Sequence, residues 1–180
     1  MEKTILGITG EMAAGKGTAT EYLMKKYGAT SYRFSTALRD IAKRMYLKES
    51  RENLQKLSTV LRENFDDNIL SMVIYKDVES DENDLIVIDG VRRVPDIEFL
   101  KTLPGFRLAY IDADIEKRYE RIIKRGENSD DNSKTFEEFK KDHQREAELQ
   151  IKDLKNRADV IVDNNGSFED LYKQLDEIIK

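Results

Sequence analysis

The sequence contains no cysteine and a single histidine, His143, among its 180 residues. The absence of cysteine excludes a disulfide scaffold, a thiolate metal site and a cysteine nucleophile. A Ser-His-Asp triad or a histidine-rich metal site would have to be built around His143, which lies in a highly charged segment. Proline is also scarce, with two residues, so no stiff proline-rich linker divides the chain.

Long apolar runs and strong positive charge are missing as well. The first apolar stretch, Ile5–Ile8, is interrupted by Gly7 and is far too short for a signal peptide or a membrane span. The net charge of −5 argues against a surface that coats nucleic acid. We expect a cytoplasmic protein with no membrane or nucleic-acid partner, present as a monomer or a homodimer.

The chain nevertheless has enough apolar material for one core, because 39% of its residues are hydrophobic. Apolar runs typical of strands alternate with segments whose apolar residues recur every three or four positions, as in helices. This order predicts a parallel sheet with helices on both faces. Strands are expected at Thr4–Thr9, Ser31–Phe34, Leu85–Ile88, Phe106–Ile111 and Val160–Val162.

We expect one domain over residues 1–180, with a core made of residues 1–35, 84–125 and 156–180. A helical insertion is predicted at 36–83, and a polar, glycine-bearing lid region at 126–145. The pattern also predicts one long charged helix over Phe136–Leu154 and a helix that begins at Pro95. Ser167 and Asp170 have the spacing of a capping box at the start of the last helix.

The most informative segment is Gly10–Thr18, Gly-Glu-Met-Ala-Ala-Gly-Lys-Gly-Thr, between the first strand and a helix. Its glycines allow successive backbone N–H groups to face one anion, and the helix start adds partial positive charge. Lys16 is expected to reach the β- and γ-phosphates of ATP. The strict pattern has a hydroxyl residue directly after the lysine, whereas here Gly17 intervenes and Thr18 is the candidate for Mg²⁺. The residues expected to bind ATP here are Gly10, Ala13, Ala14, Gly15, Lys16, Gly17 and Thr18.

This loop resembles that of nucleoside monophosphate kinases, the relatives of adenylate kinase, in which Gly-Thr commonly follows the lysine. The resemblance implies an α/β fold of the P-loop NTPase type, three-layer α/β/α with a five-stranded parallel sheet, a helical acceptor-binding insertion and a mobile lid. It also implies ATP as phosphoryl donor, Mg²⁺ as cofactor and a nucleoside or deoxynucleoside monophosphate as acceptor. Lys16 would then be catalytic, because it stabilises charge that grows in the transition state.

The same resemblance extends to residues that would bind the acceptor. Ser35 and Arg39 match a Ser/Thr and an Arg that bind the acceptor in the family, although their spacing is shorter than in adenylate kinase. Arg62 ends a run, Leu54–Arg62, that resembles the helical acceptor region of deoxynucleoside monophosphate kinases. Cations are needed here because the acceptor carries a phosphate.

A second acceptor motif follows the third strand. Asp89-Gly90-Val91-Arg92-Arg93 resembles the Asp-Gly-x-x-Arg of the family. The resemblance makes Asp89 a catalytic residue that holds Mg²⁺ through water, at the carboxyl end of a central strand. Arg93 has the position of the arginine that binds the acceptor phosphate, and Arg92, one residue earlier, is an alternative.

Arginines also precede the predicted lid. Arg118, Arg121 and Arg125 share one face of a predicted helix that leads into the lid region. Because phosphoryl transfer depends on positioning and on cations, Arg121 and Arg125, nearer the lid, are the catalytic candidates. The resemblance further implies that Asn165 and Gly166 pass the adenine ring of the donor and bind ATP.

Two other interpretations remain open. The segment Ala158–Ser167 resembles the end of dephospho-CoA kinases, although Asp89–Arg93 stands where that family usually has a Pro-Leu-Leu-type run. A regulatory or non-catalytic nucleotide-binding protein is the alternative from another class. Against this class, the Asn-Lys-x-Asp motif of GTPases is absent, and Gly90 occupies the position of the catalytic glutamate of motor ATPases.

Overall fold

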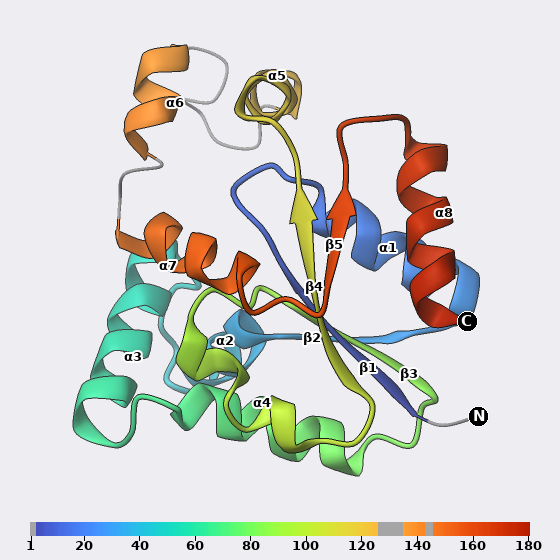
Figure 1. Cartoon of the computed structure of the whole chain (residues 1–180). Helices are drawn as coiled ribbons and strands as arrows, with labels where there is room; N and C mark the ends of the chain where they lie inside the picture. Colours follow the sequence, from blue (N-terminus) through green and yellow to red (C-terminus); the bar gives the residue numbers. More distant parts are fainter. Residues whose placement is uncertain (1–2, 126–134, 143–145) are drawn as a thin grey trace.

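The computed structural model describes residues 3–125, 135–142 and 146–180, without the side chains of Arg51, Arg125, Asp142 and residues 146–149. Its centre is a five-stranded sheet in which every neighbouring pair is parallel, in the order β2-β3-β1-β4-β5 (Figure 1). The strands are β1 (Thr4–Thr9), β2 (Thr30–Arg33), β3 (Leu85–Asp89), β4 (Phe106–Asp112) and β5 (Val160–Asp163). The predicted five-stranded parallel sheet is confirmed.

Helices cover both faces of this sheet and make the three-layer fold that was predicted. One face is covered by α1 (Lys16–Tyr27) and α8 (Phe168–Ile179). The other face is covered by the elements α2 (Phe34–Arg44), α4 (Ile69–Ser80), α7 (Glu146–Lys155) and the short 3₁₀ helices η1 (Val94–Ile97) and η2 (Leu100–Thr102). On that face α3 (Arg51–Asn64) also packs against the core through Leu54, Leu57 and Leu61. Two further helices are α5 (Ile115–Arg125) and α6 (Phe136–Asp142).

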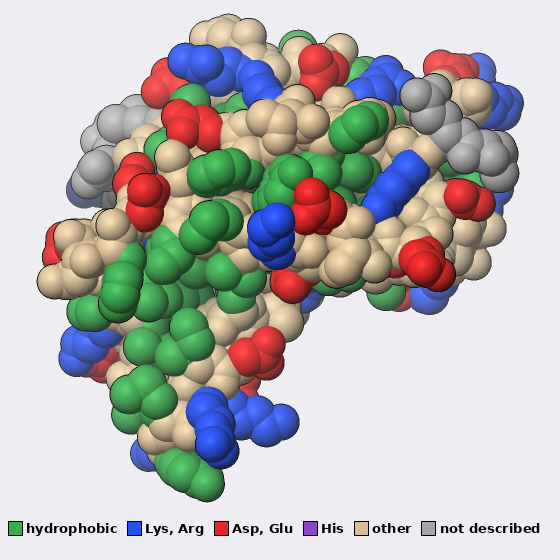
Figure 2. Space-filling model, turned by 90° about the horizontal axis from the view of Figure 1, so that it is seen from below, with side chains coloured by type: hydrophobic (Ala, Val, Ile, Leu, Met, Phe, Trp, Pro, Cys, Tyr) green, Lys and Arg blue, Asp and Glu red, His purple; other side chains and the backbone are tan. Residues whose placement is uncertain are grey.

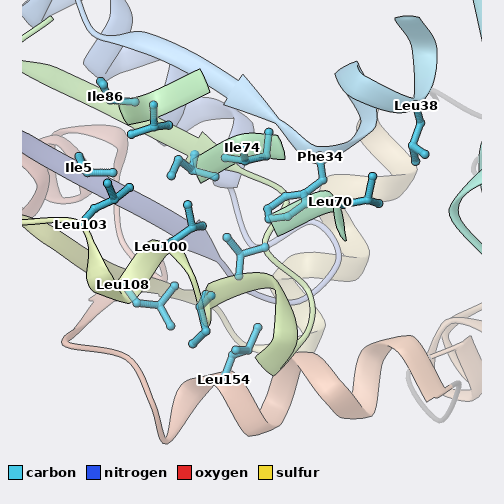
Figure 3. Close-up of a cluster of buried hydrophobic side chains, with 14 residues drawn as sticks. Ile5, Phe34, Leu38, Leu70, Ile74, Ile86, Leu100, Leu103, Leu108 and Leu154 are labelled. Atoms are coloured by element: carbon cyan, nitrogen blue, oxygen red, sulfur yellow. The ribbon is translucent and has the colours of Figure 1, made fainter. Parts of the chain in front are cut away.

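Two hydrophobic cores lie on the two faces of the sheet because successive strand residues point in opposite directions. In β3, Ile86 and Ile88 pack with α2 and α4 (Figure 3), whereas Leu85 and Val87 pack with α1 and α8. A central parallel strand buried on both faces needs this continuous apolar run. Leu154 of α7 completes the first core.

The helix ends follow local rules, with three departures from the sequence prediction. Gly28 ends α1 in the left-handed conformation, and Ser167 forms the predicted capping box with Asp170. The single helix predicted over Phe136–Leu154 is wrong, because the structure has two helices, α6 and α7, on either side of residues 143–145. Pro95 lies in a 3₁₀ helix of four residues. The spacing of apolar residues predicts that the first helix starts at about Thr18, but α1 begins at Lys16 because the left-handed Gly15 caps it.

The insertion between β2 and β3 is helical, as predicted, and comprises α2, α3 and α4. Figure 2, seen from the α4 side, shows hydrophobic side chains gathered on a lobe that projects from the molecule. Large apolar side chains of the insertion remain exposed, namely Met45, Tyr46, Leu47, Val60, Phe65 and Met72. No helix in the described part of the chain combines the length and apolar character needed to cross a membrane.

Candidate functional site

The predicted phosphate-binding loop joins β1 to α1 (Figure 1). Gly15 has φ of 108° and forms the N-cap of α1. The first turn of α1 contains no acidic residue and receives no hydrogen bond from a capping side chain. The helix dipole therefore favours negative charge at this helix start, which is where an anion would bind.

The carbonyl groups of the loop are held by side chains. Every carbonyl from Gly10 to Ala14 accepts a hydrogen bond from Lys16, Arg118, Arg121 or Asn164. In a trans peptide the C=O and N–H groups point in opposite directions, so N–H groups of these peptides turn away from those side chains. The N–H of Ala14 closes a turn on the Glu11 carbonyl. The arrangement is that of a nest that binds anions.

Lys16 lies against the loop that it is expected to serve. Its Nζ donates to the carbonyl oxygens of Gly10, at 2.6 Å, and Glu11, at 2.9 Å. The flexible side chain of lysine allows this ammonium group to exchange carbonyl oxygens for phosphate oxygens. Lys16 thus lies on the predicted loop, and its contact with phosphates and its catalytic role stay predictions.

The two glycines beside Lys16 differ in whether a side chain could replace their hydrogen. A Cβ at Gly15 would lie 2.1 Å from Nδ2 of Asn164, whereas a Cβ at Gly17 would meet no atom within 4 Å. We expect Gly15→Ala to lower the free energy of unfolding by about 1–3 kcal/mol, since φ of 108° strains any other residue. It should also weaken ATP binding. Gly17→Ala is the matched control and should leave stability unchanged or raise it; urea denaturation and calorimetry measure both effects.

Asn164 is the site residue that sequence reasoning missed. It is buried, its Nδ2 donates to the Ala14 carbonyl at 2.7 Å, and its own carbonyl accepts from Nη2 of Arg121 at 2.7 Å. Arg121 also donates to the carbonyls of Ala13 and Ala14, and burial lowers the pKa of its guanidinium group. Arg121 and Asn164 therefore join the loop to the segments that follow β4 and β5. The one available signal was that Asn164 directly follows a strand.

Arg118 has a different environment from the one predicted. It was expected on one face of the helix with Arg121 and Arg125, leading into the lid, but it is buried and pairs with Glu11 Oε2 at 3.0 Å. Its Nε also donates to the Ala113 carbonyl at 2.9 Å. Lys152 of α7 lies 4.0 Å from the other oxygen of Glu11. The acidic residue within the loop thus connects it to α5 and α7. The side chain of Arg125 and the lid residues 126–134 and 143–145 lie outside the described residues.

Asn165 and Gly166 serve the starts of neighbouring helices. The Asn165 Oδ1 accepts from the N–H of Asp114 at 2.8 Å, and its carbonyl accepts from Lys117. A Cβ at Gly166 would lie 2.5 Å from Oδ2 of Asp170, the residue that caps α8. These contacts explain both residues without a ligand, and their predicted contact with the donor base stays a prediction.

The residues proposed for Mg²⁺ supply suitable atoms but no complete site. Asp89 ends β3, and its Oδ2 lies 3.0 Å from Nε of Arg33. Thr18 lies in the first turn of α1. Hydroxyl and carboxylate oxygens suit Mg²⁺, which keeps several waters and is usually bound together with substrate phosphates. The described residues contain no group of three or more His, Cys, Asp or Glu that could hold a metal ion.

On the acceptor side, Ser35 and Arg39 lie on α2. Ser35 is in its first turn, at the carboxyl end of β2. The exposed Nη1 of Arg39 pairs with Glu49 Oε2 at 3.2 Å. Among the described contacts, none brings Arg39 to another of the predicted acceptor arginines.

Arg62 and Arg93, in contrast, come together from separate elements. Both contact Asp67 and both contact Asp96, whose side chain is 4% exposed. Burial raises the pKa of the Asp96 carboxyl, while the charge of Arg62 opposes this rise. The side chain of Arg92 is exposed and makes no hydrogen bond or ion pair with another described residue. Sequence reasoning did not identify either aspartate.

Comparisons with known proteins agree with this fold. The UPF0200 protein MJ1399 of Methanocaldococcus jannaschii is 29% identical over 178 residues, which cover 98% of this chain and 89% of the relative. A UPF0200/UPF0201 protein of Archaeoglobus fulgidus is 33% identical over 183 residues, 99% of this chain and 56% of the relative. The chain therefore spans a little over half the length of the second relative.

Solved structures similar to this chain share its architecture at low sequence identity. TT1252 from Thermus thermophilus has a TM-score of 0.63 and 18% identity, with 99% of this chain and 97% of that chain covered. A shikimate kinase from Bacteroides thetaiotaomicron has a TM-score of 0.64 and 11% identity, with 97% and 96% covered. These likenesses show that the chain shares the α/β fold of these proteins. The profile of the AAA domain family matches residues 9–140, and the chain therefore belongs to this family of AAA domains.

Proposed function

We propose that this protein transfers the terminal phosphoryl group of ATP to a small phosphorylated acceptor, with a nucleoside or deoxynucleoside monophosphate as the first candidate. The observation that carries the proposal is the Gly10–Thr18 loop, whose carbonyls from Gly10 to Ala14 accept from side chains, while the start of α1 has no side-chain cap and no acidic residue that would repel an anion. Lys16 adds a positive charge at this nest.

The acceptor side supports transfer to a phosphorylated molecule. Phosphoryl transfer needs two anionic groups held close together, which requires cations on both sides. Lys16 lies on the loop. Arg62 lies in the last turn of α3, and Arg92 and Arg93 follow β3. A protein that only binds ATP has no need for this second set.

Mg²⁺ would be held by the nucleotide phosphates, with Thr18 and Asp89 contributing directly or through water. When bound, this ion neutralises charge on phosphate oxygens. The protein itself positions the two substrates and adds the charge of Lys16 and of the arginines. The partners expected for this reaction are small-molecule nucleotides. We also propose that the protein is cytoplasmic and is a monomer or a homodimer.

Dephospho-CoA is the second candidate acceptor, because Ala158–Ser167 resembles the end of dephospho-CoA kinases. Purified protein with Mg²⁺ and ATP is to be assayed against all ribo- and deoxynucleoside monophosphates and dephospho-CoA. We expect ADP release that depends on one class of nucleoside monophosphate. Transfer only to dephospho-CoA would select the second candidate, and calorimetry showing no binding of ATP with Mg²⁺ would contradict both.

A further inference from the structure

Two arginines of the insertion and the β3 end form a charged cluster with two aspartates. Nη2 of Arg62 lies 3.2 Å from Oδ1 of Asp96, and Nε of Arg93 lies 3.6 Å from the same oxygen. Like charges from separate elements approach each other only where negative charge offsets their repulsion. Asp96 supplies this charge from the buried side of the cluster.

Asp96 is fixed from several directions. Its Oδ2 accepts from the backbone N–H groups of Arg92, at 3.1 Å, and Arg93, at 3.0 Å. Its carbonyl accepts from the buried hydroxyl of Ser71 in α4 at 2.9 Å. The carboxylate therefore holds both guanidinium groups in place from a rigid position.

Asp67 approaches the same arginines from the solvent side. Its Oδ1 lies 3.0 Å from Nη1 of Arg93 and 3.8 Å from Nη1 of Arg62, and its side chain is 57% exposed. Its backbone carbonyl also accepts from both arginines, at 3.0 Å and 3.2 Å. One exposed carboxylate oxygen between two guanidinium groups has the position that an oxygen of a bound phosphate would take.

The two aspartates differ in how readily they can leave. Asp96 is buried, so its removal would leave buried positive charge without a partner. Asp67 lies in the turn between α3 and α4, and an exposed ion pair of this kind contributes little free energy. A phosphate monoester, with up to two negative charges and several acceptor oxygens, can replace the carboxylate while the Asp67 carbonyl keeps its own contacts.

Resting on the function proposed above, in which Arg62 and Arg93 bind the acceptor phosphate, we propose that the Asp67 carboxylate occupies the position of that phosphate until the acceptor replaces it. Asp96 is the positioning residue of the pair. The acceptor class is a small molecule with a terminal phosphate, and Asp67 lowers its affinity by competing for the arginines.

The test compares Asp67→Asn with Asp66→Asn. Both variants remove one negative charge from the same turn. The Asp66 carboxylate, however, accepts from the N–H of Asn68 and forms no ion pair with Arg62 or Arg93 among the described contacts. Inorganic phosphate is titrated calorimetrically into the full chain saturated with ADP and Mg²⁺, which fill the donor loop. We expect Asp67→Asn to bind phosphate about two- to fivefold more tightly than the native protein, and Asp66→Asn to match the native protein.

Asp96→Asn should have the opposite effect and lower the affinity for phosphate by about tenfold or more. Asp96→Glu, which keeps the charge, should recover part of this loss. Where turnover is measured, Asp67→Asn should lower the acceptor KM and leave kcat and the KM for ATP unchanged. Equal phosphate affinity in Asp67→Asn and Asp66→Asn, weaker binding in Asp67→Asn, or no phosphate binding by any variant would overturn the proposal. Failure to bind ADP contradicts the proposed function instead, and titration of the nucleotide-free variants still compares the two aspartates.

Discussion

Lys16→Ala is expected to lower kcat for phosphoryl transfer by about 10²–10³-fold, since one preorganised donor to transition-state charge contributes this much in other enzymes. The native ammonium group lies within 2.9 Å of the carbonyls of Gly10 and Glu11, whereas the guanidinium groups of Arg118 and Arg121 contact the later carbonyls of the loop. A steady-state assay with the acceptor found in the substrate panel measures the effect. ATP affinity should fall less than kcat, because the charge that Lys16 meets grows as the phosphoryl group moves.

Lys25→Ala is the control for this experiment. Lys25 is on the same helix, is exposed, and its one ion pair among residues 3–125, 135–142 and 146–180 is with Glu21, one turn earlier. Its removal should leave kcat and the KM for ATP unchanged. Native turnover in Lys16→Ala would contradict both the role of this residue and the assignment of the loop as a donor site.

Arg118→Met is expected to lower the free energy of unfolding by about 3 kcal/mol, because it leaves the carboxylate of Glu11 largely buried without its partner. Lys152, 4.0 Å from the other oxygen of Glu11, offsets part of the loss. Urea denaturation followed by circular dichroism measures the change. Adding Glu11→Gln to Arg118→Met should recover part of the stability, since the unpaired charge is then gone.

Lys124→Met is the matched control on α5, because Lys124 is exposed and has no ion pair among the described residues. It should change the free energy of unfolding by no more than about 0.5 kcal/mol. A similar loss in both variants would mean that Arg118 stabilises α5 through general helix effects instead of through Glu11.

Much of the fold could be predicted because its signals are local. The continuous run of β3, the glycines around Lys16 and the Ser167 capping box each depend on neighbours within a few residues. The missed features depend on partners far along the chain. Arg118 pairs with Glu11 across more than a hundred residues, so nothing beside it in the sequence distinguishes a buried cation from a solvent-facing one.

The candidate site shows the same limit at finer scale. Asn165 was predicted and Asn164 was missed, because the difference is set by where β5 ends against β4, with Asp163 opposite Asp112. The backbone N–H of Asn164 then bonds the Asp112 carbonyl, and its side chain reaches Ala14. Arg62 and Arg93 were each predicted singly, but their convergence depends on Asp67 and Asp96, whose role requires the packing of three segments.

The outward carbonyls of Gly10–Ala14 have a consequence for the energetics of ligand capture. Because lysine, arginine and asparagine side chains already hold each of these oxygens, the loop has its working backbone shape before any triphosphate arrives. Preorganisation of this kind spares the complex most of the ordering entropy that a disordered glycine-rich turn would lose. Under the function proposed above, the affinity of the loop for ATP would be limited by desolvation of the phosphates and by the exchange of Lys16 from carbonyl to phosphate oxygens.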